Sequence, residues 1–440
     1  MVLAAENLSA RGLTGPLYSG VDLCVGPGEC VCITGPTGCG KSTLLRTMAG
    51  LHDHGPEGKV LLDGRPVSRA LPGRIGLILQ NPEIQLFCPD IGSELAFGLE
   101  NLCVPPADMG SRMQRALSRV GLNLPLDRPV NTLSVGQKYK LLLASVLVME
   151  PSVLLLDEPC AQLDQDGIGA VNRILDVFLH DGGSVIICEH DPSVLTIAYR
   201  LHLIAEQPGD QSGPVLRDAG HSTARSGGVV VKLDNAALDL GGFRVWENLD
   251  LSLSTGEIAI VLGPNGAGKT SLLRTLTGFL PLGAGHATVF GQHPTPKNLR
   301  GKVGLLVQNP SRQLTEDTVL EEVALPLTYK KFSKQRRAAE AKEILDSLNL
   351  TSLADKPPFL LSHGQQHLVA LASVLAARPG LLLLDDPFVG LDPYHVAKVW
   401  NILDLASSEG AAVICALHRL PATRGAHSVY TLSRLGLETC

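Results

Sequence analysis

The sequence predicts two tandem α/β domains, each built around a mainly parallel core sheet. The chain contains an internal repeat, in which corresponding residues of the two copies always lie the same number of positions apart. Within each copy, short apolar runs of the kind buried in parallel sheets alternate with helical patterns. Each copy also places a glycine-rich loop between a predicted strand and a predicted helix. The equally spaced pairs include Lys41 and Lys269, Gln80 and Gln308, Ser134 and Ser362, Asp157 and Asp385, and His190 and His418.

The composition is that of a folded protein with more than one domain. The chain has 440 residues, a length that corresponds to two or three domains with separate cores. Hydrophobic residues make up 45% of the sequence, which is enough for such cores. The 37 basic and 43 acidic residues give a net charge of -6, so we expect no nucleic-acid partner.

The domain boundaries follow from the segment between the two copies. Residues 206–228 are rich in Gly, Pro, Ser, Asp and Gln and have no apolar period. Such a composition is typical of a flexible linker. We therefore predict a first domain at 1–206, a linker at 207–228 and a second domain at 229–440.

Strands and helices can be placed in both copies from their apolar patterns. Nearly continuous apolar runs at 31–34, 153–156 and 184–188 predict buried strands. Amphipathic spacing predicts helices at 113–120 and 336–348. We interpret the basic cluster at 330–337 as a solvated helix face rather than a binding patch.

The cysteines and the longest apolar runs indicate the cellular compartment in which the chain is expected to fold. The ten cysteines show no CxxC pair and no zinc-ligand spacing, a pattern that suits a reducing cytoplasm. We expect Cys30, Cys32, Cys188 and Cys415 to act as small buried hydrophobic residues. The longest candidate segment, 141–149, is about half the roughly 18 residues needed to span a bilayer. There is no secretory signal pattern at the N-terminus, so we expect a membrane role only through partners.

Two glycine-rich loops predict phosphate binding. Both match the pattern Gly-x4-Gly-Lys-Ser/Thr between a strand and a helix. The glycines let successive backbone N–H groups point at phosphate oxygens, and the helix N-terminus adds positive potential. We expect Lys41 and Lys269 to reach the β and γ phosphates of ATP, and Ser42 and Thr270 to ligate Mg²⁺. The predicted phosphate-binding residues are Gly35, Pro36, Thr37, Gly38, Cys39, Gly40, Lys41, Ser42 and Thr43, and Gly263, Pro264, Asn265, Gly266, Ala267, Gly268, Lys269, Thr270 and Ser271.

Acidic pairs follow an apolar strand in each copy and predict the catalytic edge. The pairs are Asp157-Glu158 and Asp385-Asp386. They lie at the carboxyl ends of strands, where α/β sheets bind ligands. The first acid of each pair is predicted to orient Mg²⁺, and the second to polarise the attacking water. Because Asp386 is one methylene shorter than Glu158, we expect the first copy to be the stronger hydrolytic site.

A glutamine and a histidine complete each predicted site. Gln80 and Gln308 each follow an apolar strand, and we expect them to contact Mg²⁺ and the attacking water. His190 and His418 each end a short strand, and each follows the first aspartate of its acidic pair at the same spacing along the chain. This matched placement favours a role for both histidines in sensing the γ-phosphate. Without the repeat, each of these residues would be interpreted as an ordinary surface or structural side chain.

Two further segments make the chain resemble the ABC ATPase family. Residues 133–137 (Leu-Ser-Val-Gly-Gln) and 361–365 (Leu-Ser-His-Gly-Gln) are similar to the family's Leu-Ser-Gly-Gly-Gln signature, and 161–164 and 389–392 are similar to its D-loop. The resemblance covers nearly the whole chain. It implies two P-loop NTPase domains of ABC ATPase type, each with an antiparallel β portion and a helical subdomain. Further ATP-binding residues carried over from the signature are Ser134, Gly136, Gln137, Ser362, Gly364 and Gln365.

The resemblance also implies that the two halves form an intramolecular head-to-tail dimer with composite sites. The signature helix of one half would complete the ATP site of the other, with its N-terminus facing the γ-phosphate. The first site would join Lys41, Gln80, Asp157, Glu158 and His190 to Ser362 and Gly364. The second would join Lys269, Gln308, Asp385, Asp386 and His418 to Ser134 and Gly136.

The chain departs from the family pattern at two places. Val135 and His363 replace the middle glycine of the signature. The expected positions of an adenine-stacking aromatic fall near Gly12 and Leu240, which leaves Tyr18 and Phe243 as open alternatives.

The segments after the two glutamines resemble those of energy-coupling factor importer ATPases. They begin Gln-Asn-Pro at 80–82 and 308–310 and are each followed by a helical pattern. The resemblance implies uptake of a vitamin or a transition-metal ion. The partners would be a transmembrane coupling protein and a separate membrane substrate-binding subunit. The chain would then be a peripheral protein at the cytoplasmic face of the cell membrane.

Other ABC classes remain as alternatives. A fused sugar-importer ATPase also has two domains with one weakened site. A ribosome-acting ABC protein usually carries a long charged linker and a glutamate in both sites, whereas this chain has a short Gly/Pro linker and Asp386. A DNA-repair ABC protein would need a long insertion between the phosphate loop and the signature, and the spacing leaves no room for it.

Overall fold

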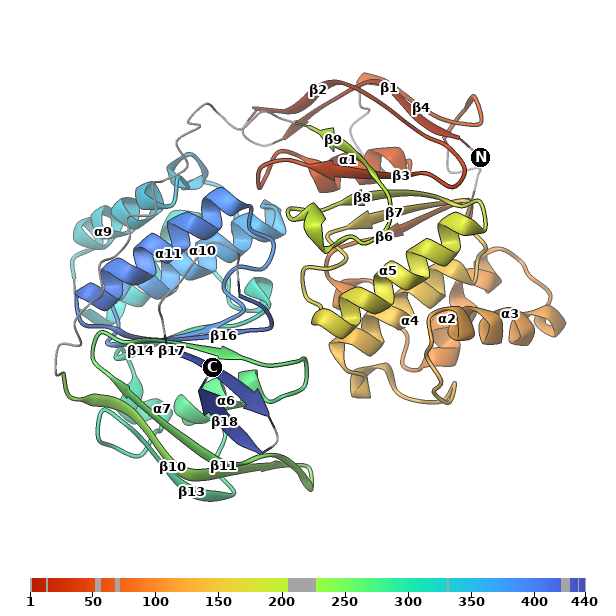
Figure 1. Ribbon diagram of the computed structural model, residues 1–440. Coiled ribbons are helices and arrows are strands. Elements are labelled where there is room, and N and C mark those ends of the chain that lie inside the picture. The colour runs from red at the N-terminus through yellow and green to blue at the C-terminus, as the bar shows by residue number, and fades with distance from the viewer. Residues whose placement is uncertain are drawn as a thin grey trace. The chain divides into compact units, whose positions relative to one another are not determined.

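The computed structural model describes residues 2–12, 15–51, 57–67, 72–204, 227–330, 332–420, 428–433 and 435–439. The chain divides into two compact units, Met1–Asp210 (the first unit) and Gln211–Cys440 (the second unit) (Figure 1). The predicted linker at 207–228 lies outside the described residues except for its last two glycines. The boundaries at 206 and 229 therefore stay predictions. None of the helices in the described part of the chain combines the length and the apolar character that crossing a membrane requires.

The core of the first unit is a five-stranded parallel sheet, as the apolar runs predict. Its strand order is β6-β7-β8-β3-β9, and every neighbouring pair is parallel. All residues of β7 and β8 are buried, which explains why these strands are apolar without alternation. The strands are β3 (Cys30–Thr34), β6 (Ile75–Ile78), β7 (Val153–Asp157), β8 (Ser184–Cys188) and β9 (Arg200–Leu203).

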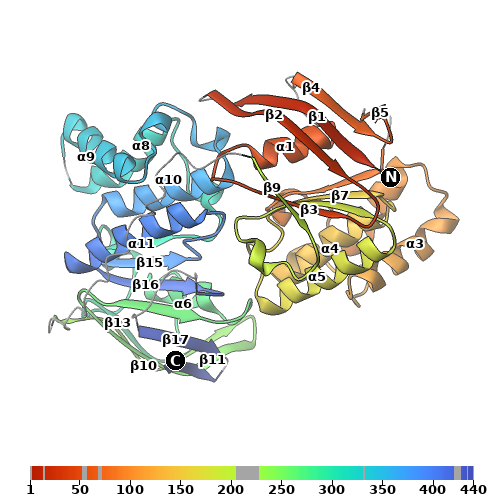
Figure 2. The same ribbon diagram turned by 45° about the horizontal axis from the view of Figure 1, so that its top comes forward.

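A second, antiparallel sheet covers one face of this core. Its order is β2-β1-β4-β5, and it confirms the antiparallel portion implied by the family resemblance. The helix α1 (Lys41–Met48) lies between the two sheets (Figure 2). Its Leu44, Leu45 and Met48 are fully buried. The strands are β1 (Leu3–Gly12), β2 (Gly15–Val25), β4 (Glu57–Leu62) and β5 (Arg65–Pro66).

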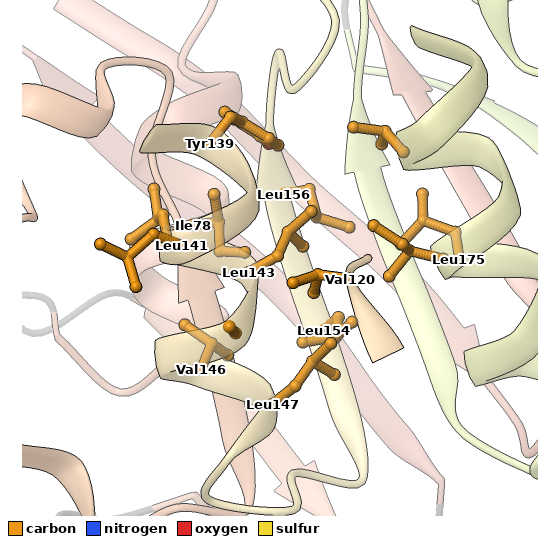
Figure 3. Close-up of a cluster of buried hydrophobic side chains, with 14 of the residues drawn as sticks. Ile78, Val120, Tyr139, Leu141, Leu143, Val146, Leu147, Leu154, Leu156 and Leu175 are labelled. Atoms are coloured by element: carbon orange, nitrogen blue, oxygen red, sulfur yellow. The ribbon is translucent and has the colours of Figure 1, made fainter. Parts of the chain in front are cut away.

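Helices cover the opposite face of the parallel sheet. Figure 3 shows Leu143 and Leu147 of α4 packed over Leu154 and Leu156 of β7. Truncating one such leucine to alanine costs about 2–5 kcal/mol, so this layer fixes α4 on the sheet. The helices are α2 (Ile91–Asn101), α3 (Pro106–Arg119), α4 (Val135–Leu147) and α5 (Gln165–His180), with short 3-10 turns η1 (Pro82–Ile84), η2 (Val130–Thr132) and η3 (Pro192–Val194).

The second unit repeats the same layers. Its larger sheet has the order β14-β15-β16-β12-β17-β18, in which only β18 is antiparallel to its neighbour, and its smaller antiparallel sheet has the order β11-β10-β13. Figure 1 shows α6 between these two sheets. The strands are β10 (Val229–Leu240), β11 (Phe243–Ser254), β12 (Ile258–Leu262), β13 (Ala284–Val289), β14 (Val303–Leu306), β15 (Leu381–Asp385), β16 (Ala412–Leu417), β17 (Ser428–Ser433) and β18 (Gly436–Thr439).

Five of the six helices described in the second unit correspond to those of the first, and α7 has no counterpart among the described residues. The predicted helix at 336–348 is α9, and Lys330, Lys334 and Arg336 of the basic cluster are exposed, as we expected of a solvated face. The helices are α6 (Lys269–Leu276), α7 (Pro296–Leu299), α8 (Val319–Ala324), α9 (Lys334–Ser347), α10 (His363–Ala376) and α11 (Pro393–Ser408), with 3-10 turns η4 (Pro310–Arg312), η5 (Leu325–Lys330), η6 (Thr351–Leu353) and η7 (Pro358–Leu360).

The cysteines behave as predicted within the described residues. Cys30, Cys32, Cys188 and Cys415 are buried in the two sheets, and all four are free thiols. Burial raises the pKa of Cys30, Cys32 and Cys415 to about 12, so these thiols are inert at neutral pH.

Candidate functional site

The first phosphate loop connects β3 to α1 and wraps around a lysine. Lys41, the first residue of α1, donates from Nζ to the carbonyls of Gly35 (2.8 Å) and Pro36 (3.1 Å). Gly38 and Gly40 have φ angles of 83° and 98°, which only glycine adopts readily. The loop therefore encircles a positive charge at a helix N-terminus, an arrangement that favours anions.

The second loop has the same geometry. Lys269 donates from Nζ to the carbonyls of Gly263 (2.6 Å) and Pro264 (3.1 Å). Gly268 has a φ of 91°, and a Cβ there would lie 2.5 Å from Val245 Cγ1 and 2.8 Å from Trp246 Cδ1. The backbone thus approaches β11 too closely for any other residue, which explains the glycine.

The hydroxyl that follows each lysine pairs with the aspartate that ends β7 in the first unit or β15 in the second. Thr270 donates from Oγ1 to Asp385 Oδ2 at 2.6 Å, and Ser42 hydrogen-bonds to Asp157. The Oδ1 atom of Asp157 is buried and has no hydrogen-bond partner among the described residues. Hydroxyl and carboxylate oxygens beside a phosphate loop are the ligands that Mg²⁺ prefers, and the unpartnered oxygen is an acceptor that the ion or one of its waters would satisfy. These residues therefore fit a magnesium site in both units.

Both strand-end aspartates have raised pKa values. Burial and the neighbouring Glu158 raise the pKa of Asp157 to about 6. Burial and the neighbouring Asp386 raise the pKa of Asp385 to about 6, although the Thr270 hydrogen bond acts in the opposite direction. Two adjacent buried acids repel each other, so this edge of each unit attracts cations.

Glu158 is the central side chain of a network in the first unit. Gln80 donates from Nε2 to Glu158 Oε2 at 2.7 Å, and His190 donates from Nε2 to Glu158 Oε1 at 3.0 Å. The structure thus brings the predicted glutamine, acid and histidine together from the ends of β6, β7 and β8.

The second unit closes the corresponding network differently. Gln308 donates from Nε2 to Asp386 Oδ2 at the longer distance of 3.3 Å. His418 contacts Asp386 Oδ1 at 3.0 Å through Nδ1, so its other nitrogen, Nε2, is the buried one without a partner among the described residues. The shorter acid is therefore met by the opposite edge of the imidazole ring.

The signature residues have a local role that the sequence reasoning missed. Ser134 caps α4: its side chain accepts from Gln137 N (3.3 Å), and the Gln137 side chain accepts from Ser134 N (3.0 Å). Ser362 and Gln365 form the same capping box on α10 at 3.3 and 3.1 Å. The spacing Ser-x-x-Gln before an apolar helix is the sequence signal for this motif.

No hydrogen bond or ion pair in the described part of either unit links these capping residues to that unit's own acid network. Both serines are exposed at their helix N-termini. They therefore present a hydroxyl and positive helix potential to the surroundings.

The loop after each glutamine is fixed by two side chains that were not singled out from the sequence. Gln85 accepts from Leu79 N (2.7 Å) and donates to the Leu77 carbonyl (3.1 Å), and Glu94 of α2 accepts from the N–H groups of Phe87 (3.1 Å) and Cys88 (2.9 Å). Their equivalents Gln313 and Glu322 do the same in the second unit. The internal repeat contained the signal, since both pairs obey its spacing.

The open alternatives for an adenine-stacking aromatic differ in exposure. Tyr18 is 4% exposed and its hydroxyl pairs with Thr47 Oγ1 at 3.2 Å, so its ring belongs to the core. Phe243 is 75% exposed at the beginning of β11. Only Phe243 therefore has a ring face available to a ligand.

Comparison with known proteins agrees with this geometry. The sequence model of the family described as ABC transporter matches residues 18–161 and 246–389, once in each unit. The chain is 27% identical to YkoD of Bacillus subtilis (strain 168) over 96% of this chain and 88% of that protein. YkoD carries a provisional assignment as an HMP/thiamine import ATP-binding protein. An ABC transporter ATP-binding protein of Methanosarcina mazei, also provisionally assigned, is 29% identical over 92% of this chain and 87% of its own length.

Solved structures share the fold. A chain of the ribosome-bound archaeal Pelota and ABCE1 complex superposes with a TM-score of 0.71 at 20% identity, covering 99% of this chain and 78% of that one. At this identity, the likeness shows the fold alone.

Proposed function

This chain belongs to the ABC transporter family and, with ATP and Mg²⁺ as its cofactors, hydrolyses ATP; from that premise we propose that it energises a membrane importer of the energy-coupling factor type. The imported substrate would be a vitamin or a transition-metal ion. The chain would act at the cytoplasmic face of the cell membrane, bound to a transmembrane coupling protein with a separate substrate-binding subunit.

The ATP sites in this proposal are composite. The two halves would associate head to tail, so that each exposed signature helix faces the phosphate loop of the other half. The exposed serines and free N-terminal potential of α4 and α10 support this, because they would otherwise have no anion to face. The proposed first site joins Lys41, Gln80, Asp157, Glu158 and His190 to Ser362 and Gly364, and the second joins Lys269, Gln308, Asp385, Asp386 and His418 to Ser134 and Gly136.

The chemistry at the first site follows from its side chains. Lys41 and the loop N–H groups hold the β and γ phosphates, and Mg²⁺, when bound, neutralises charge on their oxygens. Glu158 polarises a water for in-line attack on the γ-phosphorus and accepts its proton, while the bond to the β–γ bridging oxygen breaks and ADP leaves. Gln80 and His190 hold the Glu158 carboxylate from both sides and orient it.

The second site is proposed to hydrolyse ATP more slowly. Asp386 reaches less far, its glutamine contact is longer, and its histidine presents the other nitrogen. Each difference moves the acid away from the geometry that Glu158 has in the first unit.

The observation that carries the importer proposal is an apolar surface beside Gln80. Ile84, Phe87 and Phe97 are 66%, 63% and 45% exposed, and the rings of Phe87 and Phe97 pack edge to face with centroids 4.7 Å apart. Large exposed hydrophobic side chains that cluster in this way are typical of protein interfaces. We call these three residues the aromatic patch. It lies on the segment that Gln85 and Glu94 tie to the end of β6, so a partner bound there would be mechanically linked to Gln80.

The energy-coupling factor type and the substrate class are supported by sequence resemblance. The Gln-Asn-Pro segments resemble those of such ATPases, and the name of the relative YkoD refers to HMP/thiamine import. A ribosome-acting function receives support from the fold likeness alone, and the aromatic patch favours a protein partner in the membrane instead.

The test is to purify the tagged full-length chain from gently solubilised cells and to identify co-purifying proteins by mass spectrometry. We expect a polytopic membrane protein near one to one. The double variant Phe87→Ser/Phe97→Ser should lose it, whereas Val177→Ser, which changes an equally exposed residue of α5, should retain it. Recovery of ribosomes, or of no membrane protein, would reject the importer proposal and leave the ATPase.

A further inference from the structure

The backbone at the proposed base of the first site is strained. Glu158 has a φ of 47°, in the left-handed region that residues other than Gly, Asn and Asp rarely adopt. A residue held there is strained and persists only where the surrounding structure fixes it. Asp386 has a φ of 50°, but aspartate tolerates this region better. The first unit therefore needs stronger local support for its acid than the second.

That support comes from a buried carboxylate that no part of the proposed mechanism uses. Glu189 is 4% exposed, and its Oε1 accepts a hydrogen bond from the backbone N–H of Cys160 at 3.0 Å. The next residue, His190, binds Glu158 itself at 3.0 Å. Two successive side chains after β8 thus hold the short segment 158–160, one at its first residue and one at its last.

The holding residue is itself firmly placed. The Glu189 N–H donates to the Ile33 carbonyl at 3.1 Å, which extends the pairing with β3 by one residue beyond β8. The Glu158 N–H donates to the Cys188 carbonyl at 2.9 Å. The carboxylate therefore acts from the rigid centre of the parallel sheet rather than from a loop.

The second unit has the backbone link but not the carboxylate. Asp386 N donates to the Ala416 carbonyl at 2.9 Å, as in the first unit. In the second copy of the repeat, Leu417 and Phe388 stand at the positions of Glu189 and Cys160. Leucine accepts no hydrogen bond, and the Phe388 ring packs on Trp400 with centroids 4.7 Å apart. The carboxylate is thus present in the unit with the strained glutamate and absent from the unit with the tolerant aspartate.

We propose that Glu189 is a positioning residue for the first site: its carboxylate holds the Cys160 N–H and so keeps Glu158 in the conformation that orders the attacking water. The inference rests on the proposed role of Glu158 as base. Glu189 touches neither nucleotide nor water in this account and acts only through the segment 158–160.

The test compares two isosteric changes in the full-length chain. Glu189→Gln keeps an acceptor oxygen at the same reach and removes the charge, whereas Glu189→Asp keeps the charge and withdraws the oxygen by one methylene. We expect Glu189→Asp to lower kcat for ATP hydrolysis about tenfold, the effect of losing one hydrogen bond to a charged group, with KM for ATP within twofold. Glu189→Gln should retain kcat within about threefold. Leu417→Met, at the matched position of the second unit, should change neither constant.

Three results would overturn the proposal: a Glu189→Asp kcat within twofold of the parent, a Glu189→Gln loss as large as that of Glu189→Asp, or a loss confined to KM. If Glu189→Asp fails to fold, Glu189→Leu supplies the same comparison with the side chain of the second unit. Glu158→Gln measured alongside separates the two proposals. Turnover surviving in that variant rejects Glu158 as base, whereas its loss together with an active Glu189→Asp rejects only the positioning role.

Discussion

The two units share a fold and a constant repeat, and they differ where the acid meets the glutamine. Glu158 accepts from Gln80 at 2.7 Å, whereas Asp386 accepts from Gln308 at 3.3 Å. Their phosphate loops are alike, with each lysine bound to the first two carbonyls of its loop. Duplication has therefore kept the half of the site that we propose to bind the nucleotide and changed the half that we propose to carry out the chemistry.

The histidines show how the second unit accommodates its shorter acid. His190 binds Glu158 through Nε2, and His418 binds Asp386 through Nδ1, both at 3.0 Å. Because Nδ1 lies closer to the backbone than Nε2, His418 meets its acid with the near edge of the ring, whereas His190 does so with the far edge. The second network is closed but shorter, which is consistent with binding ATP without equal turnover.

The largest expected difference between the two units comes from neutralising each acid separately. Glu158→Gln should lower kcat for ATP hydrolysis at least about 100-fold, because the amide cannot accept the proton of the attacking water. Asp386→Asn should lower it less than about threefold. Phosphate release by the purified full-length chain measures both, and a retained affinity for ATP serves as the control. If Asp386→Asn were the more damaging change, the assignment of the stronger site would be wrong.

A second comparison concerns a buried residue just beyond the signature. His367 is fully buried, and burial together with His363 lowers its pKa to about 3, while Asp386 and the Pro387 backbone act in the opposite direction. The first unit has Tyr139 there. In the unfolded chain, this histidine binds a proton as the pH falls below about 6.5, whereas in the folded chain it stays neutral there. Its contribution to the free energy of unfolding is therefore lost as the pH falls from about 6.5 towards 3.

His367→Tyr should remove this acid sensitivity from the second unit. Between pH 7 and pH 5, the parent chain should lose about 2 kcal/mol more unfolding free energy than the variant, the effect of one unprotonated histidine over that interval. Denaturant melts at several pH values give the difference in slope. His286→Gln, a change of an exposed histidine, should leave the slope as it is. Equal slopes for the parent and His367→Tyr would contradict the assignment.

The glutamines test the same asymmetry at a smaller scale. Gln80→Ala removes the 2.7 Å contact that orients Glu158, and we expect kcat to fall about tenfold. Gln308→Ala removes a 3.3 Å contact, and the expected fall is about twofold. Steady-state hydrolysis at saturating ATP measures both. Equal losses of kcat would show that the longer contact matters as much as the shorter one. The difference between the two contact distances would then have no effect on hydrolysis.

The repeat is what made most of the site predictable from the sequence. A lone Gln80 or His190 carries no signal, but a partner at the constant spacing of the repeat, each at a strand end, predicts the edge at which both lie. Parallel strands bring their carboxyl ends to one edge, so the order of the strands was enough to assemble Gln80, Glu158 and His190.

Other features could not be predicted because they depend on side-chain geometry or break the repeat. Which nitrogen His418 presents is decided by the length of Asp386 and the packing around it. Glu189 has Leu417 as its counterpart, so the repeat gave no indication of a role for Glu189. A glutamate that follows an apolar run indicates only the end of a strand. Its role emerged only from the 3.0 Å contact with a backbone N–H that sequence does not display.

The capping boxes offer the smallest and most symmetrical test. Ser134→Ala and Ser362→Ala each remove an N-cap with the same geometry, so each should lower the free energy of unfolding by about 1 kcal/mol. If the composite arrangement is right, their effects on turnover should differ, because Ser362 would complete the stronger first site. We expect about a threefold loss of kcat for Ser362→Ala and almost none for Ser134→Ala.

Ser333→Ala is the matched control for that comparison. Ser333 caps α9 by accepting from Arg336 N at 3.3 Å, and it belongs to no proposed ATP site. Its replacement should cost similar stability and leave kcat unchanged, which separates loss of a cap from loss of a phosphate contact. If Ser134→Ala lowered turnover and Ser362→Ala did not, each signature would serve the site of its own half. The head-to-tail arrangement would then be rejected, while the assignment of the acids would stand.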